Sequence, residues 1–262
     1  MIISISVKII KITLILTSIV LVGVYMFKYK RAYEETVINE QGAIISEYNN
    51  IHTVVLDEKE YSYAWTQVND LENLFLYPNF ENKDTLEEGV KNYECQSLVS
   101  GGFYSKDSSP IGLFISEGKV VNKSAKNTLF NGYFILTKND KVTIEKNYFG
   151  EPIRIGLQTG PILIQNEQPQ KLSLVNDKNA RRIVAALTNE NELYFIVFYD
   201  KESVFLGPLL VDLPRLVNKI QDGMDIKFIS AINLDGGSAS AYYSEDIQLS
   251  ELTPIGSFFC VK

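Results

Sequence analysis

Histidine and cysteine are scarce in this sequence of 262 residues. It contains one histidine, His52, and two cysteines, Cys95 and Cys260, with no C-x-x-C pair. Structural zinc sites draw their ligands mainly from cysteine and histidine, so we do not expect a zinc site built by the protein alone. The two cysteines leave two interpretations open: a disulfide formed in an oxidising compartment, or two free buried thiols.

Positive charge is also in deficit. Lysine and arginine together number 25 against 32 acidic residues, which gives a formal net charge of −7 and an isoelectric point of about 5.0. Nucleic-acid-binding domains usually carry a basic surface, so we expect no nucleic-acid partner. An anionic ligand would have to be held by local cations or by backbone N–H donors.

The overall composition is that of a globular protein rich in β-structure. Hydrophobic residues make up 45% of the chain and charged residues 22%, which is enough for a substantial core. There are 15 tyrosines and 14 phenylalanines, and aromatic side chains favour strands.

The first 31 residues are set apart by their hydrophobicity. Residues 12–27 form a run of 16 residues without a charge, flanked by lysines on both sides. A membrane-spanning helix needs about 20 residues, and the run reaches that length when it is extended to Ile9 with snorkelling lysines. No small-x-small cleavage site follows it, so we predict an uncleaved signal-anchor and a transmembrane helix within residues 1–31. The flanking charges do not fix its orientation.

The remainder is predicted to be one α+β domain, β-rich, mixed or antiparallel, with few helices. Residues 32–50 are polar and are interpreted as a linker or a short helix, and residues 51–262 as the domain. Short apolar runs separated by polar turns predict hairpins within 111–122, 131–145 and 182–199. Apolar residues recur at helical spacing after Asp212, an expected N-cap, and before Gly223, an expected C-cap.

A strand-like run at residues 228–234 ends in Asp235, Gly236 and Gly237, followed by Ser238 and Ser240. An acid directly after a buried strand is held rigidly and can still reach a ligand. Glycines allow backbone N–H groups to approach an anion closely. The alternative is an ordinary turn in which the aspartate bonds to its own backbone.

A second strand-like run, residues 96–100, ends in Ser100 and the double glycine Gly101-Gly102. Together with the Asp235 turn it belongs to an ordered set of motifs. The set is Ser-Gly-Gly-Phe-Tyr at 100–104, the hairpin at 111–120, Gln-Thr-Gly-Pro-Ile-Leu at 158–163, Ala-Arg-Arg at 180–182, and the segment from 206 through the predicted helix to 238. In this order, residues 95–262 resemble the phosphodiester glycosidase domain family. That family includes the lysosomal enzyme that uncovers mannose 6-phosphate, and bacterial proteins associated with exopolysaccharide biosynthesis. Ser100 departs from the family, which usually has asparagine at this position; the change implies a shifted substrate or a lost activity.

The resemblance implies a site for a sugar-1-phosphodiester, which needs phosphate recognition, a carboxylate and groups that bind sugar hydroxyls. Asp235 is the predicted acid, base or nucleophile, with a metal ligand as the alternative, and Arg182 is the predicted phosphate contact. A second carboxylate would come from Asp107 or Asp200. The predicted substrate-binding residues are Ser100, Gly101, Gly102, Gln158, Gly236, Gly237, Ser238 and Ser240. No cofactor is identified, and a divalent metal is left open.

The function expected from the resemblance is that of a membrane-anchored hydrolase. Its substrate would be a sugar-1-phosphodiester in an extracytoplasmic glycan or a lipid-linked sugar, which places the domain outside the cytoplasm. The expected partners are therefore a carbohydrate or sugar-phosphate substrate and, through the N-terminal helix, the membrane. The alternative is a non-catalytic protein that binds glycans or assists assembly in exopolysaccharide biosynthesis.

Overall fold

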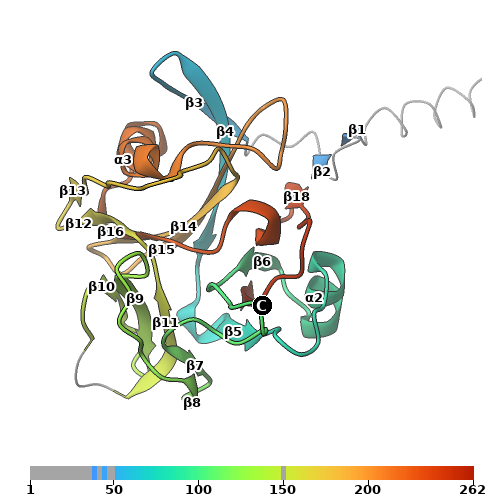
Figure 1. The fold of residues 1–262 in the computed structure, drawn as a ribbon, viewed down its shortest axis with the longest axis vertical. Coiled ribbons are helices and arrows are strands. Elements are labelled where there is room, and N and C mark those ends of the chain that lie inside the picture. Colours follow the sequence, from blue (N-terminus) through green and yellow to red (C-terminus); the bar gives the residue numbers. More distant parts are fainter. Residues whose placement is uncertain (1–36, 40–42, 46–50, 149–151) are drawn as a thin grey trace, which may run out of the picture.

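The computed structural model describes residues 37–39, 43–45, 51–148 and 152–262, and Figure 1 shows their arrangement. Within these residues the strands form three sheets in which all neighbouring strands are antiparallel, and there are two α-helices. The predicted β-rich single domain with few helices is confirmed. Three short 3-10 helices complete the described elements, at Leu71–Asn73, Leu210–Asp212 and Gly237–Ala239.

The central sheet has seven strands in the order β13-β12-β16-β14-β15-β4-β3. Their bounds are Gln168–Pro169 (β13), Ile162–Gln165 (β12), Phe228–Asn233 (β16), Arg182–Thr188 (β14), Leu193–Tyr199 (β15), Lys59–Val68 (β4) and His52–Leu56 (β3). Alternate residues of β14 belong to different cores: Val184 and Ala186 pack toward α3, whereas Ile183 and Ala185 pack into the core shared with the other sheets. Both faces are therefore buried, which explains the nearly continuous apolar sequences of β14 and β15.

Helix α3, Leu213–Met224, confirms the helix predicted from apolar spacing, and it lies beside β12, β13 and β16 in Figure 1. Asp212 is the N-cap residue, as predicted, although its side chain makes no capping hydrogen bond. The predicted C-cap is wrong, because Gly223 lies inside the last turn. Asp225, in the left-handed conformation with φ 53°, closes the helix instead.

A second sheet of five strands has the order β10-β9-β11-β7-β8. The bounds are Val142–Glu145 (β10), Gly132–Thr137 (β9), Ile153–Thr159 (β11), Phe114–Ser116 (β7) and Lys119–Asn122 (β8). The pairs β7–β8, β9–β10 and, in the central sheet, β14–β15 confirm the three predicted hairpins. Polar turns between short apolar runs were sufficient to predict these local pairings.

The third sheet has seven strands in the order β1-β2-β18-β17-β6-β19-β5. The bounds are Val37–Asn39 (β1), Ala43–Ile45 (β2), Ile247–Leu249 (β18), Tyr242–Tyr243 (β17), Ser97–Ser100 (β6), Ser257–Val261 (β19) and Leu74–Pro78 (β5). The described residues of the segment predicted as a linker or short helix, 32–50, are the strands β1 and β2. They pair with each other, and β2 extends the sheet next to β18.

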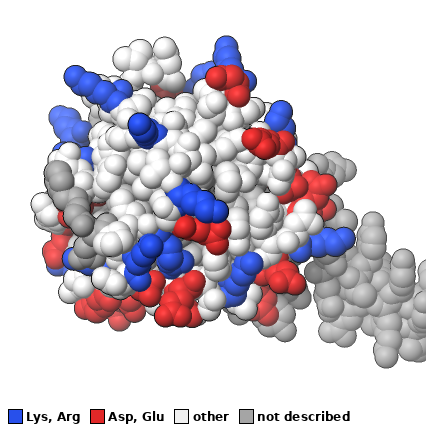
Figure 2. Space-filling model, turned by 90° about the horizontal axis from the view of Figure 1, so that it is seen from below, with Lys and Arg blue, Asp and Glu red and all other residues white. Residues whose placement is uncertain are grey.

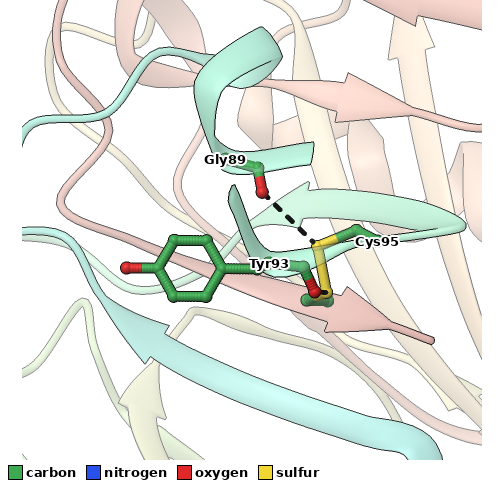
Figure 3. The surroundings of a disulfide bond; sticks show 4 residues. Gly89, Tyr93 and Cys95 are labelled. Atoms are coloured by element: carbon green, nitrogen blue, oxygen red, sulfur yellow. Dashed lines mark hydrogen bonds between the residues drawn. A yellow bond between two sulfur atoms is a disulfide. The ribbon is translucent and has the colours of Figure 1, made fainter. Parts of the chain in front are cut away.

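Helix α2, Leu86–Tyr93, is joined to the third sheet by a disulfide between Cys95 and Cys260 (Figure 3). Its N-terminus is a capping box in which Thr85 and Glu88 bond to each other's backbone. The disulfide links residues 165 positions apart, so it ties the end of the chain to the segment after α2. Of the two interpretations that the sequence left open for the cysteines, the structure has the disulfide.

The predicted membrane anchor, residues 1–31, lies outside the described residues. Among the residues that are described, no helix combines the length and the apolar character needed to cross a membrane.

Candidate active site

The two double-glycine turns predicted from the sequence meet in the structure. The Asp235 N–H donates to the carbonyl of Gly101 at 2.8 Å, and the Ser100 hydroxyl donates to the backbone carbonyl of Asp235 at 2.8 Å. Strand β16 carries the chain to Asp235 and β6 carries it to Ser100, so two different sheets supply the two halves. The structure thus brings together residues that are 135 positions apart in the sequence.

Asp235 is buried, with 7% of its surface exposed. Burial raises the pKa of its carboxyl group well above the usual value for aspartate, and only the backbone N–H of Gly236 acts in the opposite direction. A carboxyl group with a raised pKa keeps its proton to higher pH, which is the property of a general acid. Asp235 also contributes, after burial, to the raised pKa of Tyr104, whose hydroxyl donates to the carbonyl of Pro254.

The glycine N–H groups do not form the predicted anion cradle, because they already have acceptors. Gly101 N–H donates to the Ser257 carbonyl at 2.8 Å and Gly102 N–H to the Ser257 hydroxyl at 3.0 Å. Gly237 N–H donates to the Arg181 carbonyl at 2.8 Å. These donors serve the packing of the turns against neighbouring backbone.

Close backbone approach explains why glycines stand at these positions. A Cβ atom on Gly101 would lie 2.8 Å from the Ser257 hydroxyl, and one on Gly236 would lie 2.8 Å from the Arg181 carbonyl oxygen. Gly237 has φ 67°, in the left-handed region that favours glycine. The glycines therefore let the Gly101 turn lie directly against β19 and the Asp235 turn lie directly against Arg181, just before β14.

Arg182 does not join the Asp235 turn. Its guanidinium group pairs with Asp177 at 3.2 Å and donates to the carbonyls of Pro208 at 3.1 Å and Lys178 at 2.6 Å. Burial lowers the pKa of Arg182, and Asp177 opposes that change. Side chains alternate between the two faces of the sheet along β14, and Arg182 lies on the face that packs against α3. The predicted phosphate contact of Arg182 is therefore not supported.

The neighbouring Arg181, which was not among the predicted site residues, lies under the turn. It is fully buried, and its Nε donates to the Ser240 hydroxyl at 2.6 Å. Its Nη2 donates to the carbonyls of Ser240 and of Ser250, the latter at 2.6 Å. Nη1 has no hydrogen-bond partner among the described residues. Burial lowers the pKa of Arg181 to about 10, with Glu251 acting in the opposite direction.

Sequence alone could not decide between the two arginines. Both faces of β14 are buried, so hydrophobic alternation gives no signal for the face on which the site lies. Only the pairing of β14 with β16, and the continuation of that pairing to the Asp235 turn, places Arg181 beneath Ser240.

Gln158 has a structural role in this conformation. Its Oε1 accepts from the N–H groups of Leu113 at 3.1 Å and Ala125 at 3.0 Å, and its Nε2 donates to the carbonyls of Ala125 at 2.6 Å and Phe130 at 3.0 Å. The side chain is 2% exposed. These bonds hold the loop before β9, in which Phe130 stacks on Phe103 with ring centroids 4.4 Å apart.

The two predicted serines at the turn differ in exposure. Ser240 is fully buried, and its hydroxyl donates to the Gly237 carbonyl at 2.7 Å while it accepts from Arg181. Ser238 is exposed, and its hydroxyl lies 3.2 Å from that of Thr253. The hydroxyl groups of Ser238 and Thr253 could therefore donate hydrogen bonds to a ligand or accept them from it.

The two candidates for a second carboxylate make contacts within their own turns. Asp200 accepts from the N–H of Glu202 at 2.9 Å. The pKa of Asp107 is lowered, chiefly by a hydrogen bond from Ser105. Neither contact connects these residues to Asp235. The described residues contain no group of three or more histidine, cysteine or acidic side chains placed to hold a metal.

Surface charge on the face shown in Figure 2 is mixed, with lysine and arginine side chains interspersed among acidic ones around a largely uncharged centre. A hollow of about 630 Å³ lies between β10 and the turns that follow β12 and β14, lined by Asp140, Asn166 and Asn189 among others. Asp235 is not part of its lining.

Comparison with known proteins gives matches in both sequence and structure. A sequence model of the phosphodiester glycosidase family matches residues 93–261. The catalytic domain of zebrafish N-acetylglucosamine-1-phosphodiester alpha-N-acetylglucosaminidase, auto-inhibited by its pro-peptide, has a similar fold: the TM-score is 0.64 at 16% identity, over 87% of this chain and 85% of that one. A hypothetical protein from Synechocystis is similar with a TM-score of 0.53 at 12% identity, over 84% of this chain and 62% of that one. No curated protein sequence matches the chain.

Proposed function

Since the chain belongs to the phosphodiester glycosidase family, we propose that it is a membrane-anchored hydrolase of a sugar-1-phosphodiester in an extracytoplasmic glycan or lipid-linked sugar. The reaction breaks the bond between the anomeric carbon and the phosphate oxygen. Water adds to the anomeric carbon, and the products are a free sugar and a phosphomonoester.

The buried carboxyl group of Asp235 is the observation that carries this proposal. Its raised pKa favours the protonated form. In that form it can give its proton to the departing phosphate oxygen, as a general acid does. Phosphate is already a stable anionic leaving group, so its departure depends less on protonation than the departure of an alcohol from an ordinary glycoside does. The exposed hydroxyl groups of Ser238 and Thr253 form hydrogen bonds with the sugar or the phosphate in this proposal.

Two side chains, those of Ser100 and Arg181, hold the Asp235 turn in place. Ser100 bonds to the backbone of Asp235, and Arg181 bonds to Ser240 at the other end of the same turn. Because these contacts are buried, they fix the turn with little freedom, and the geometry of a proton donor is then set before the substrate arrives.

Two observations support the membrane-anchored, extracytoplasmic part of the proposal. The apolar run at residues 12–27 has the character of a signal-anchor. The disulfide between Cys95 and Cys260 belongs to a class of bond that persists in oxidising compartments and is rare in the cytosol.

The test is sugar release from an N-acetylglucosamine-1-phosphodiester by the full chain purified in detergent. We expect Asp235→Asn to reduce the rate by about 100-fold or more, the usual contribution of a general acid. Asp222→Asn, at an exposed aspartate of α3, is the matched control and is expected to keep the rate. Failure of the wild-type chain to act on any sugar-1-phosphodiester between pH 4 and 8, or full activity of Asp235→Asn, contradicts the proposal.

A non-catalytic glycan-binding or assembly protein in exopolysaccharide biosynthesis is the second candidate. The observation that favours it is the set of N–H groups at the two glycine turns, which are bonded within the protein, together with Ser100 at a position where the family usually has asparagine. Retained glycan binding with no sugar release by the wild-type chain would support this candidate.

A further inference from the structure

A hollow of about 700 Å³ lies beside the end of β5, between the last turn of α2 and the loop that precedes β7. Three aromatic side chains, Tyr77, Phe80 and Tyr93, form much of its lining. Its volume is in the range of pockets that hold small ligands, about 300–1,000 Å³. The contacts of Asp235 involve none of these rings.

The aromatic rings are held in place by the core. Tyr93 lies edge-on to Phe258 with centroids 5.2 Å apart, and Phe80 lies edge-on to Phe114 at 5.3 Å; both of these phenylalanines are buried. Tyr77 packs against Tyr93 with centroids 4.4 Å apart. The disulfide lies next to Tyr93, as Figure 3 shows. Rings fixed in this way lose little conformational entropy when a ligand packs on them.

The polar groups of the lining indicate which ligand fits. Glu81, Asn82 and Asp107 line the hollow, and its described lining contains no lysine or arginine. Lys262 lies over the Tyr77 ring, 5.8 Å from its centroid, but is not part of the lining. A phosphate would meet acidic side chains here without a cation. A neutral sugar ring offers an apolar face to the aromatic rings and hydroxyl groups to the amide and the carboxylates.

The hollow lies at the same end of the third sheet as the Asp235 turn. At that end Pro78 of β5 is paired with Ser257 of β19, whose carbonyl accepts from Gly101 after β6. Gly101 in turn accepts from Asp235. Two strand spacings separate β5 from β6, which is roughly 10 Å. A glycan whose reacting sugar is at Asp235 could therefore extend to these rings.

We propose that the hollow lined by Tyr77, Phe80 and Tyr93 is a binding subsite for a neutral pyranose of the substrate's glycan. Sugar binding at the hollow stands on the lining and its geometry. The role as a substrate subsite rests on the proposed hydrolase function.

Binding is tested by saturation-transfer NMR with the full chain in detergent and a panel of neutral disaccharides of glucose, galactose, mannose and N-acetylglucosamine. We expect transfer from aromatic protons to at least one disaccharide. Tyr93→Ala is expected to weaken that binding tenfold or more, and Tyr93→Phe to preserve it. The control is Tyr148→Ala, which removes a half-buried tyrosine that packs on Tyr133 away from the hollow.

Tyr93 also packs in the core, so two exposed variants guard against loss of folding. Asn82→Ala and Asp107→Asn leave the aromatic packing intact and are each expected to weaken binding about threefold to tenfold. Absence of binding to every disaccharide, or equal weakening by Tyr148→Ala and Tyr93→Ala, overturns the proposal. So does unchanged binding in both exposed variants.

Two phosphodiesters separate this proposal from the hydrolase function. For a sugar-1-phosphodiester whose phosphate carries a disaccharide, Asn82→Ala should raise KM, whereas this variant should release sugar from the corresponding methyl phosphodiester as fast as the wild type does. If Asp235-dependent release occurs and KM is unchanged with both substrates, the subsite is wrong and the hydrolase stands. If the disaccharide binds but no release occurs, the substrate role fails with the hydrolase, and sugar binding at the hollow stands.

Discussion

The hydroxyl of Ser100 donates a hydrogen bond of 2.8 Å to the backbone carbonyl of Asp235. Both residues are buried: Ser100 ends β6, and Asp235 follows the end of β16, a strand of a different sheet, by two residues. Ser100 directly precedes the Gly101-Gly102 turn. Its structural role is to join the two turns of the candidate site.

Ser100→Ala should loosen that junction. A buried carbonyl without its donor costs about 1–3 kcal/mol, so we expect a loss of that size in the free energy of unfolding and a lower rate of sugar release. Ser116→Ala is the matched control, because its buried hydroxyl donates to the Leu76 carbonyl at 2.7 Å away from the Asp235 turn. Urea unfolding and activity should separate the two: equal loss of activity in both variants would contradict a positioning role for Ser100.

The raised pKa of Asp235 predicts a pH dependence of stability. In the unfolded chain the group titrates near 3.9, whereas the folded protein holds the proton to higher pH. Between these two pKa values the folded state binds more protons, so stability relative to Asp235→Asn falls as pH rises, by at most about 1.4 kcal/mol per pH unit. Urea unfolding of both proteins from pH 3 to pH 8 measures the difference. A constant difference across this range would show that the pKa is not raised.

The two adjacent arginines should respond differently to replacement by lysine. Arg181→Lys removes bonds to Ser240 and Ser250 beneath the Asp235 turn, each worth about 1.5–3 kcal/mol for a charged donor. We expect lower stability and a sugar-release rate reduced tenfold or more. Arg182→Lys disturbs contacts with Asp177 and Pro208 and should lower stability without a comparable loss in rate. Steady-state kinetics on protein that is still folded decides; a larger rate loss in Arg182→Lys would reverse our assignment.

Two glycine-to-alanine variants test the close backbone approach. In Gly236→Ala the new Cβ would lie 2.8 Å from the Arg181 carbonyl oxygen, and we expect a loss of about 1–3 kcal/mol in the free energy of unfolding. Gly223→Ala has room, since its nearest neighbour is the Tyr63 hydroxyl at 3.5 Å, and it lies inside α3. That variant should gain about 0.5–1 kcal/mol. Thermal or urea unfolding measures both, and similar shifts in the two variants would argue against the packing account.

Removal of the disulfide should lower stability by about 2–5 kcal/mol, because the bond constrains a long segment of the unfolded chain. The comparison is between urea unfolding of the wild type with and without a reductant, and of the double variant Cys95→Ala, Cys260→Ala. The double variant should be insensitive to the reductant. A wild type that is equally stable in both conditions would contradict the prediction.

Local sequence patterns determined much of this protein. Apolar runs between polar turns gave the hairpins β7–β8, β9–β10 and β14–β15, and helical spacing gave α3. The order of the motifs indicated the family, and the position of Asp235 directly after a strand-like run indicated that it is a candidate site residue. These features depend on residues near one another in the chain, where periodicity and turn chemistry act directly.

Only the tertiary structure decided which partners the candidate side chains have. Arg181 rather than Arg182 lies under the turn, because the pairing of β14 with β16 assigns the faces of a strand that is buried on both sides. Gln158 holds a loop, and the glycine N–H groups bond to residues distant in sequence. The reason is physical: a buried polar group must find a partner, and that partner is set by which strands meet, which no local pattern records.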